Sequence, residues 1–180
     1  MNDDTAMPPA VPGDDKDWTW VLDRPCPECG FEAAATDPAE VAGLLRANAR
    51  RWVELLTGDE GPVRRRPSPA AWSALEYGAH VRDVCRLYLE RLDLMLNEDA
   101  PRYPNWDQDE TAVADRYHEA DPRALAAELV TAAEALAERF DTVGGPQWDR
   151  TGHRSDGAEF TVASFARYFI HDPVPVSYTH

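Results

Sequence analysis

The sequence predicts an all-α protein, a four-helix bundle with an extended N-terminal lead-in. Apolar residues recur at three- and four-residue spacing in four long segments, which is the pattern of helices that bury one face. Capping residues, glycines and prolines separate these segments, and no convincing series of strands is present. The connections after the first and second segments are long enough to cross the bundle, so we expect an up-down-down-up arrangement.

The first 17 residues differ in composition from the rest of the chain. They include three prolines and five aspartates and show no apolar periodicity. Such a segment buries too little apolar surface to offset the entropy lost on ordering, so we predict a disordered acidic tail over 1–17. A single domain is expected to follow over 18–180.

An extended lead-in is expected between this tail and the first helix. A short amphipathic stretch is followed by Pro25, Pro27 and Gly30, which exclude a helix. Two cysteines, Cys26 and Cys29, stand within the same segment. We therefore predict extended chain with a tight turn at the cysteines.

The first two long helices have clear start signals. Asp37 is a good N-cap and is followed by proline, so a helix is predicted over about 37–57. Ser73 and Glu76 have the spacing of a capping box at the start of the second helix, which is expected to reach about Leu96. Four charged residues of this helix are expected to face solvent: Arg86, Glu90, Arg91 and Asp93.

The second half of the chain predicts a short helix and two long ones. The short helix is expected over 109–117, and Asp121 with the proline after it begins the third long helix. A polar loop is expected over 148–159. Thr161 then caps the fourth helix, which Pro173 is expected to bend or stop.

Charge and hydrophobicity exclude several classes of partner. The 180 residues include 18 Lys and Arg against 33 Asp and Glu, a net charge of −15, which disfavours nucleic acid and anionic membranes. No stretch approaches the ~20 apolar residues of a membrane helix, and the N-terminus lacks the features of a secretory signal. We therefore expect a cytoplasmic protein that binds a small molecule, with a homodimer as one expected assembly.

Two histidines are candidate metal ligands. His80 lies two turns inside the second helix, and His171 follows the apolar turn of the fourth. Facing helices of a bundle can bring such residues together at a cofactor site. A catalytic metal takes about three protein ligands and keeps a position open, so two histidines alone do not complete a site. For His80, a hydrogen-bonded core position is the other interpretation.

Three segments resemble a known family. They are 72–83, 157–162 and 168–172. Together they resemble the DinB-like superfamily, and in particular its actinobacterial branch of mycothiol-dependent maleylpyruvate isomerases and related thiol S-transferases. The similarity covers most of the chain from about Trp18 onward, and the tryptophan, serine, glutamate and histidine of the second helix form its most specific part.

The resemblance implies a divalent metal, zinc or nickel, held between the second and fourth helices. His80 matches the first ligand of that family and His171 the second. The third ligand would stand four residues later, where this chain has Pro175, whose side chain has no donor atom. The terminal His180 is the candidate to complete the set, since Asp172 is expected to point elsewhere on a helix.

The resemblance also implies that the metal activates a low-molecular-weight thiol, mycothiol or a similar compound. Asp83 is the candidate catalytic residue, which would orient the ring of His80 or move a proton. Arg82, Arg154 and Trp72 are candidates to hold the thiol cofactor. The competing interpretation is that Asp83 and the arginines form surface ion pairs.

The cysteine pair admits three interpretations. Cys26 and Cys29 have the spacing of half a zinc site, but the sequence has no second such pair. They could also form a redox pair, although the surrounding pattern is not that of a thioredoxin site. The third interpretation is a tight turn with reduced thiols packed on the bundle, and Cys85 is expected to be a small core residue.

Two main functions therefore follow from the sequence, beside a third in which Cys26 and Cys29 act as a redox pair. One is a DinB-like metal-dependent enzyme that uses a thiol for transfer or isomerisation on a small electrophile. The other is a metal-free homologue that binds a small molecule or acts without a cofactor, because the expected third ligand position is Pro175.

Overall fold

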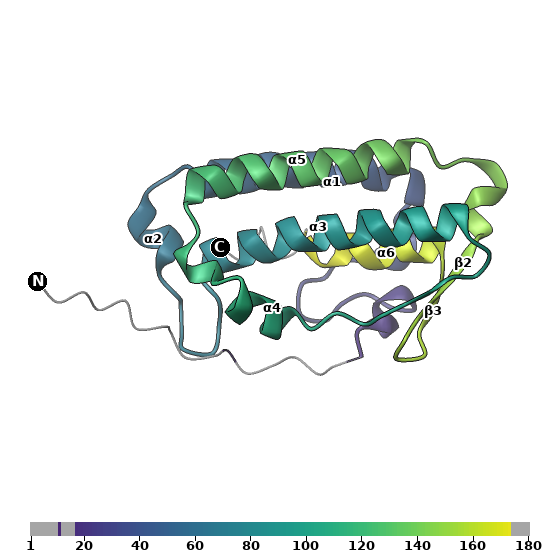
Figure 1. The fold of residues 1–180 in the computed structure, drawn as a ribbon, viewed down its shortest axis with the longest axis horizontal. Helices are drawn as coiled ribbons and strands as arrows, with labels where there is room; N and C mark the ends of the chain where they lie inside the picture. The colour runs from purple at the N-terminus through teal and green to yellow at the C-terminus, as the bar shows by residue number, and fades with distance from the viewer. Residues whose placement is uncertain (1–10, 12–16, 174–180) are drawn as a thin grey trace, which may run out of the picture.

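The computed structural model describes Val11 and residues 17–173, and it confirms the helical bundle (Figure 1). The bundle consists of the long helices α3 and α5 together with α1 and the shorter α6. Their bounds are Val41–Leu56 for α1, Ala74–Asn97 for α3, Pro122–Asp141 for α5 and Val162–His171 for α6. The predicted tail, apart from Val11 and Asp17, and the predicted ligand His180 lie outside the described residues.

The four helices form two layers. Figure 1 shows α1 beside α5 in one layer and α3 beside α6 in the other. In that view α3 and α5 run in one direction and α1 and α6 in the opposite one, so the up-down-down-up arrangement is confirmed. The connection from α3 to α5 makes this possible, because it returns the chain along the bundle (Figure 1). The connection that contains α2 joins α1 to α3 at one end, so only one of the two connections expected to cross the bundle does so.

Capping side chains fix where these helices start. Ser73 Oγ accepts a hydrogen bond from Glu76 N at 3.3 Å, and the Glu76 carboxylate accepts one from Ser73 N at 2.8 Å. Asp121 accepts from Ala124 N at 2.8 Å at the start of α5. Thr161 caps α6 in the same way through Ser164 N, as the sequence predicts. These bonds satisfy backbone donors that have no partner inside the helix.

The predicted polar loop over 148–159 is wrong, because this segment contains one strand and the first residue of another. The strands are β2 (Thr151–Arg154) and β3 (Glu159–Thr161), which pair antiparallel, and β1 (Arg102–Tyr103) pairs parallel to β2. Gly157 makes the turn with φ +98°, a conformation that suits glycine. A Cβ at Gly152 would lie 2.7 Å from Met95 Cγ, so the strand approaches α3 closely only because this residue is glycine.

Shorter elements connect the bundle. They are the 3₁₀ turns η1 (Thr19–Leu22), η2 (Ala33–Ala35), η3 (Pro38–Glu40), η4 (Tyr117–Glu119) and η5 (Gly145–Asp149), and the short helices α2 (Glu60–Arg64) and α4 (Gln108–Ala114). The predicted first helix therefore begins with a 3₁₀ turn, in which Asp37 accepts from Ala39 N at 3.0 Å. None of the helices in the described ranges is long and apolar enough to cross a membrane.

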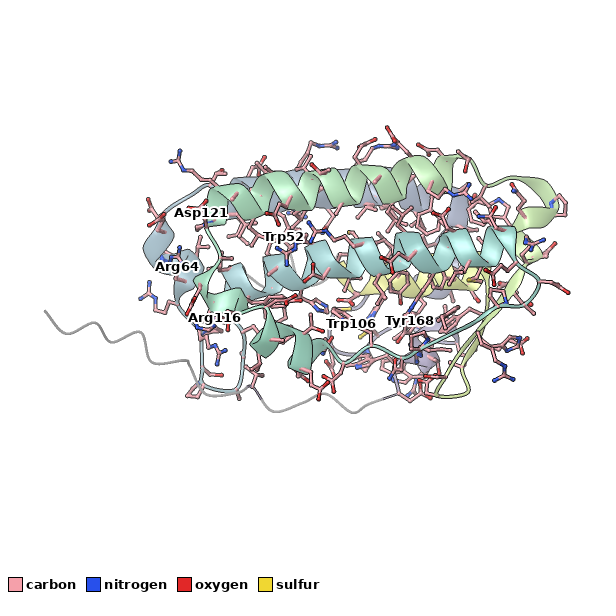
Figure 2. All side chains as sticks on the ribbon, in the orientation of Figure 1. Trp52, Arg64, Trp106, Arg116, Asp121 and Tyr168 are labelled. Carbon is pink, nitrogen blue, oxygen red and sulfur yellow. The ribbon has the colours of Figure 1, made fainter. Side chains whose placement is uncertain are left out.

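The hydrophobic core fills the space between the two layers. Figure 2 shows Trp52 of α1 there, and its side chain is fully buried. Leu75 and Leu92 of α3 and Leu129 of α5 are likewise 0% exposed. Burying a side chain of this size contributes about 1.5–3 kcal/mol, so this face of α3 is held firmly in place. The side chains on the opposite face of α3 therefore project from a helix whose position is fixed.

Candidate functional site

A large pocket lies on the face of α3 and α6 that points away from α5. Its volume is about 1470 Å³. Figure 2 shows Trp106 and Tyr168 on this side, across α3 from the layer that contains α5. The lining comes from α3, α6, the lead-in, the segment before α4 and the hairpin of β2 and β3. The lead-in, which is remote from α6 in sequence, thus forms one wall of a site on the bundle.

His80 and Asp172 meet in the wall of this pocket. The Nε2 atom of His80 lies 3.1 Å from Asp172 Oδ1 and 3.3 Å from Oδ2. The His80 side chain is 4% exposed and the Asp172 side chain 40%, so the pair joins a buried base to a solvent-accessible carboxylate. The Nδ1 atom of His80 is buried and has no hydrogen-bond partner within the described part of the chain.

Aromatic rings surround His80. Trp106 stacks on its imidazole with ring centroids 5.5 Å apart and an angle of 13° between the planes. Trp72 lies 5.5 Å away on a tilted plane, and Tyr77 packs against Trp72 at 5.3 Å. These contacts fix the orientation of the imidazole, and they place apolar surface beside its nitrogen atoms.

The start of α3 determines the position of His80 along the pocket. Arg66 Nε donates to Glu76 Oε2 at 2.9 Å, and the same carboxylate closes the capping box with Ser73. Burial alone would raise the pKa of Glu76, but the hydrogen bonds from Arg66 and Ser73 outweigh it and hold that pKa below its usual value. The carboxylate is therefore ionised, and it anchors the helix one turn before His80.

Two arginines contribute positive charge to the pocket. Arg154 is paired with Asp156 at 2.8 Å and lies 5.6 Å from the ring of Tyr168. Although burial opposes its charge, the hydrogen bonds to Asp156 and Tyr168 raise the pKa of Arg154 above its ordinary value. Arg91, which the sequence predicts to face solvent, is only 5% exposed. That prediction is wrong, because its guanidinium stacks 4.9 Å from the Tyr103 ring and donates to Pro104 O at 2.7 Å.

A second group of metal-binding side chains borders the same pocket. The ligand atoms of Cys26, Cys29 and His171 all lie within 4.8 Å of one another. Cys29 Sγ is 3.7 Å from His171 Nε2. All three described cysteines are free thiols, and Cys85 is buried in the core as predicted. Burial lowers the pKa of His171, which favours the neutral imidazole that binds metals.

The structure places the other predicted site residues as follows. Trp72 and Arg154 line the pocket. Asp83 and Arg82 bind each other instead, at 2.8 Å between Oδ1 and Nε, and neither is among the described residues that line it. Asp83 also accepts a hydrogen bond from Tyr117 at 2.7 Å, and these partners hold the pKa of Asp83 below its usual value despite burial. Asp83 thus has the ion-pair role that the sequence left as its alternative.

Three important residues were not expected in this site: Asp172, Arg91 and Trp106. The sequence predicted that Asp172 points away from the metal ligands. Its side chain does point away from His171, but it faces His80. The sequence signal for a partner of His171 was the pair Cys26 and Cys29, because two cysteines that bind a metal need further ligands. Arg91 and Trp106 carry no comparable signal, because their burial depends on the segment that covers α3.

Comparisons with known proteins agree with this architecture. The sequence profile of the DinB superfamily matches residues 44–172. The structure of YfiT from Bacillus subtilis matches with a TM-score of 0.69 at 15% sequence identity, over 77% of this chain and 81% of that one. YfiT is described as a probable metal-dependent hydrolase with an unusual four-helix bundle topology. No curated protein matches the sequence.

Proposed function

The chain belongs to the DinB superfamily, and from this premise we propose that it is a metal-dependent enzyme that uses a low-molecular-weight thiol, mycothiol or a close analogue, to transfer or isomerise a small electrophilic compound. The observation that carries the proposal is the approach of His80 Nε2 to the Asp172 carboxylate, at 3.1 Å, in the pocket wall. A buried imidazole beside a carboxylate in a large pocket is an arrangement suited to catalysis.

The two residues fit a divalent metal. An imidazole nitrogen and a carboxylate oxygen are donors that zinc and nickel accept, and both face the same space here. With the ring proton on Nδ1, the lone pair of His80 Nε2 is free to bind an ion together with Asp172. His171 lies with the cysteines, so Asp172 takes its place in the proposed ligand set. An ion held there would supply the positive charge that favours a thiolate over a thiol at neutral pH.

Two arginines are the positions in this pocket at which an anionic group would bind, because its described lining otherwise includes seven Asp and Glu residues. Arg154 and Arg91 both line it, and the Arg91 guanidinium donates to a backbone carbonyl and packs against aromatic rings. A carboxylate on the thiol or on the substrate would make charge-assisted hydrogen bonds there. Trp72 and Trp106 restrict water beside His80, which strengthens such electrostatic interactions.

A metal-free function is the second candidate, and one observation favours it. His80 and Asp172 already satisfy each other by a direct hydrogen bond, provided that the ring proton is on Nε2. In that state the pair could act as a general base or the pocket could simply bind a ligand. Whether His80 and Asp172 bind a metal is thus the question that an experiment must answer.

Metal analysis of protein purified without a histidine tag tests the proposal. We expect the His80→Ala variant to hold about one equivalent of divalent metal less than the wild type, and to lose thiol-dependent conversion of a chromogenic aryl halide. His118→Ala is the matched control, because His118 lies in η4 and is absent from the described pocket lining. Equal metal content in the wild type and His80→Ala, at normal helicity, would favour the metal-free function.

A further inference from the structure

We propose that Cys26, Cys29 and His171 form a zinc site that ties the N-terminal lead-in to the end of α6. The three ligand atoms come from two segments more than a hundred residues apart, and they lie within 4.8 Å of one another. This site is separate from the His80 and Asp172 pair, and none of its three residues is shared with it.

The distances suit a tetrahedral ion. Zinc bonds of about 2.3 Å to sulfur and 2.0–2.1 Å to nitrogen, at the tetrahedral angle, place a sulfur and a nitrogen about 3.6 Å apart and two sulfurs about 3.8 Å apart. The observed separation between Cys29 Sγ and His171 Nε2 is 3.7 Å. The 4.8 Å limit on the remaining pairs requires at most a small side-chain movement to reach those values.

The turn that carries the cysteines is built to point both sulfurs to one side. Gly30 N donates to Cys26 O at 2.7 Å, and Cys26 N donates to Phe31 O at 3.0 Å, which closes the loop around the pair. Gly30 has φ +73°, so a side chain at that position would be strained. Burial raises the pKa of the Cys29 thiol, so an ion bound there has to displace its proton.

His171 is held in place opposite this turn. The rings of Trp18 and Phe31 pack on its imidazole at 5.7 and 6.2 Å. Because Nε2 faces Cys29, the imidazole presents a donor atom to the sulfurs without reorganisation. Preorganised donors lose little entropy when an ion binds, so the cluster has the properties of a binding site as well as the composition of one.

The donor set identifies the ion. Two thiolates and one imidazole are soft to intermediate donors, which select zinc over magnesium or calcium. Binding would release the two thiol protons and leave a complex without net charge, since each thiolate cancels one positive charge of the ion. The fourth position is left for a water or a pocket ligand, as Cys29 and His171 both line the pocket.

The proposed ion has a structural consequence for the pocket. The lead-in forms one wall, and its turns η1 and η2 contact α6. An ion shared by the turn and by His171 would hold that wall against the helix. It would also fix the helix end from which Asp172 reaches His80.

Cobalt substitution of the untagged full-length protein tests the proposal. After removal of metal with a chelator, we expect one equivalent of Co²⁺ to give an intense sulfur-to-cobalt charge-transfer band, and zinc to abolish it. The band should be absent in Cys29→Ser and weaker or shifted in His171→Ala, with a fall in zinc affinity of at least about 100-fold for either. Cys85→Ala, which removes a buried thiol of α3, should keep both the band and the affinity.

Other variants keep the outcome separate from that of the proposed enzyme. His80→Ala should retain the sulfur band, whatever it does to activity, since His80 is not a ligand of this site. If Cys29→Ser fails to fold by circular dichroism, Cys26→Ser and the intact wild-type spectrum still decide the question. A cobalt spectrum without sulfur bands in the wild type would overturn the proposal. So would a Cys26–Cys29 disulfide that forms reversibly while added zinc remains unbound, because the pair would then be a redox centre.

Discussion

Two neighbouring residues at the end of α6 serve different groups. His171 faces Cys29, and Asp172 faces His80. Successive residues of a helix point about 100° apart, so one residue step is enough to reach two separate sites. A single helix end thus supplies a ligand to a sulfur-rich cluster and a carboxylate to a buried imidazole.

The two groups also differ in what supports them. His80 is 3% exposed on a helix whose other face forms the core, and two tryptophans fix its ring. Cys29, by contrast, is exposed on a turn of the lead-in. We therefore expect changes at His80 and Asp172 to act on activity, and changes at the cysteines to act on the stability of the lead-in.

Separate substitutions of Asp172 and His171 test this comparison most directly. Asp172→Asn removes the charge beside His80 and is expected to lower thiol-dependent kcat/KM by about 10–100-fold, with the sulfur-to-cobalt band intact. His171→Asn should do the reverse, with loss of the band and a much smaller change in kcat. Steady-state kinetics and cobalt spectra of both variants provide the measurement. Equal losses of kcat in the two variants would show that the groups act as one site.

Zinc should stabilise the wild type through the cysteine cluster. At a free zinc concentration about thirty times Kd, the expected gain is about 2 kcal/mol, or about 4–8 °C in Tm for a chain of this size. Cys29→Ser should show no such gain, whereas His80→Ala should keep it. Thermal unfolding followed by circular dichroism with and without zinc provides the check, and a gain retained in Cys29→Ser would contradict the separation of the two groups.

Arg154 offers a test of the anionic substrate that is independent of either metal. Arg154→Lys keeps the charge but loses the planar pair with Asp156, and KM is expected to rise about tenfold with kcat little changed. Arg123→Lys in α5 is the matched control, since Arg123 is exposed and is absent from the described pocket lining. An unchanged KM in Arg154→Lys would remove this arginine from substrate binding.

The stabilisation of the start of α3 by Glu76, which positions His80, should depend on pH. The pKa of Glu76 is lower in the folded protein than its ordinary value of 4.5, so its stabilising effect is complete above that value and is lost as the pH falls through the folded pKa. Glu76→Gln should cost about 1 kcal/mol near neutral pH, from the weakened capping box, and should reduce this acid dependence. Urea unfolding of both proteins at neutral and acidic pH gives the difference. An identical acid profile in the variant would mean that other carboxylates control it.

Local sequence signals predicted most of the bundle correctly because they act over a few residues. Ser73 with Glu76, Asp121 and Thr161 each satisfy backbone donors within one turn, so their effect is readable without the fold. The strands β2 and β3 were missed because they are short and contain polar residues, and their pairing depends on a glycine turn and on the approach of Gly152 to α3.

The candidate site divides in the same way. Sequence alone determined the helical bundle, its acidic character, and His80, His171 and the cysteine pair as residues able to bind a metal. Only the tertiary structure decided their partners, because each pair joins segments distant in sequence: His80 with Asp172, and His171 with Cys29. Local propensity determines which segments are helical and where each helix starts. The packing of the lead-in against α6 determines which donor atoms lie close together.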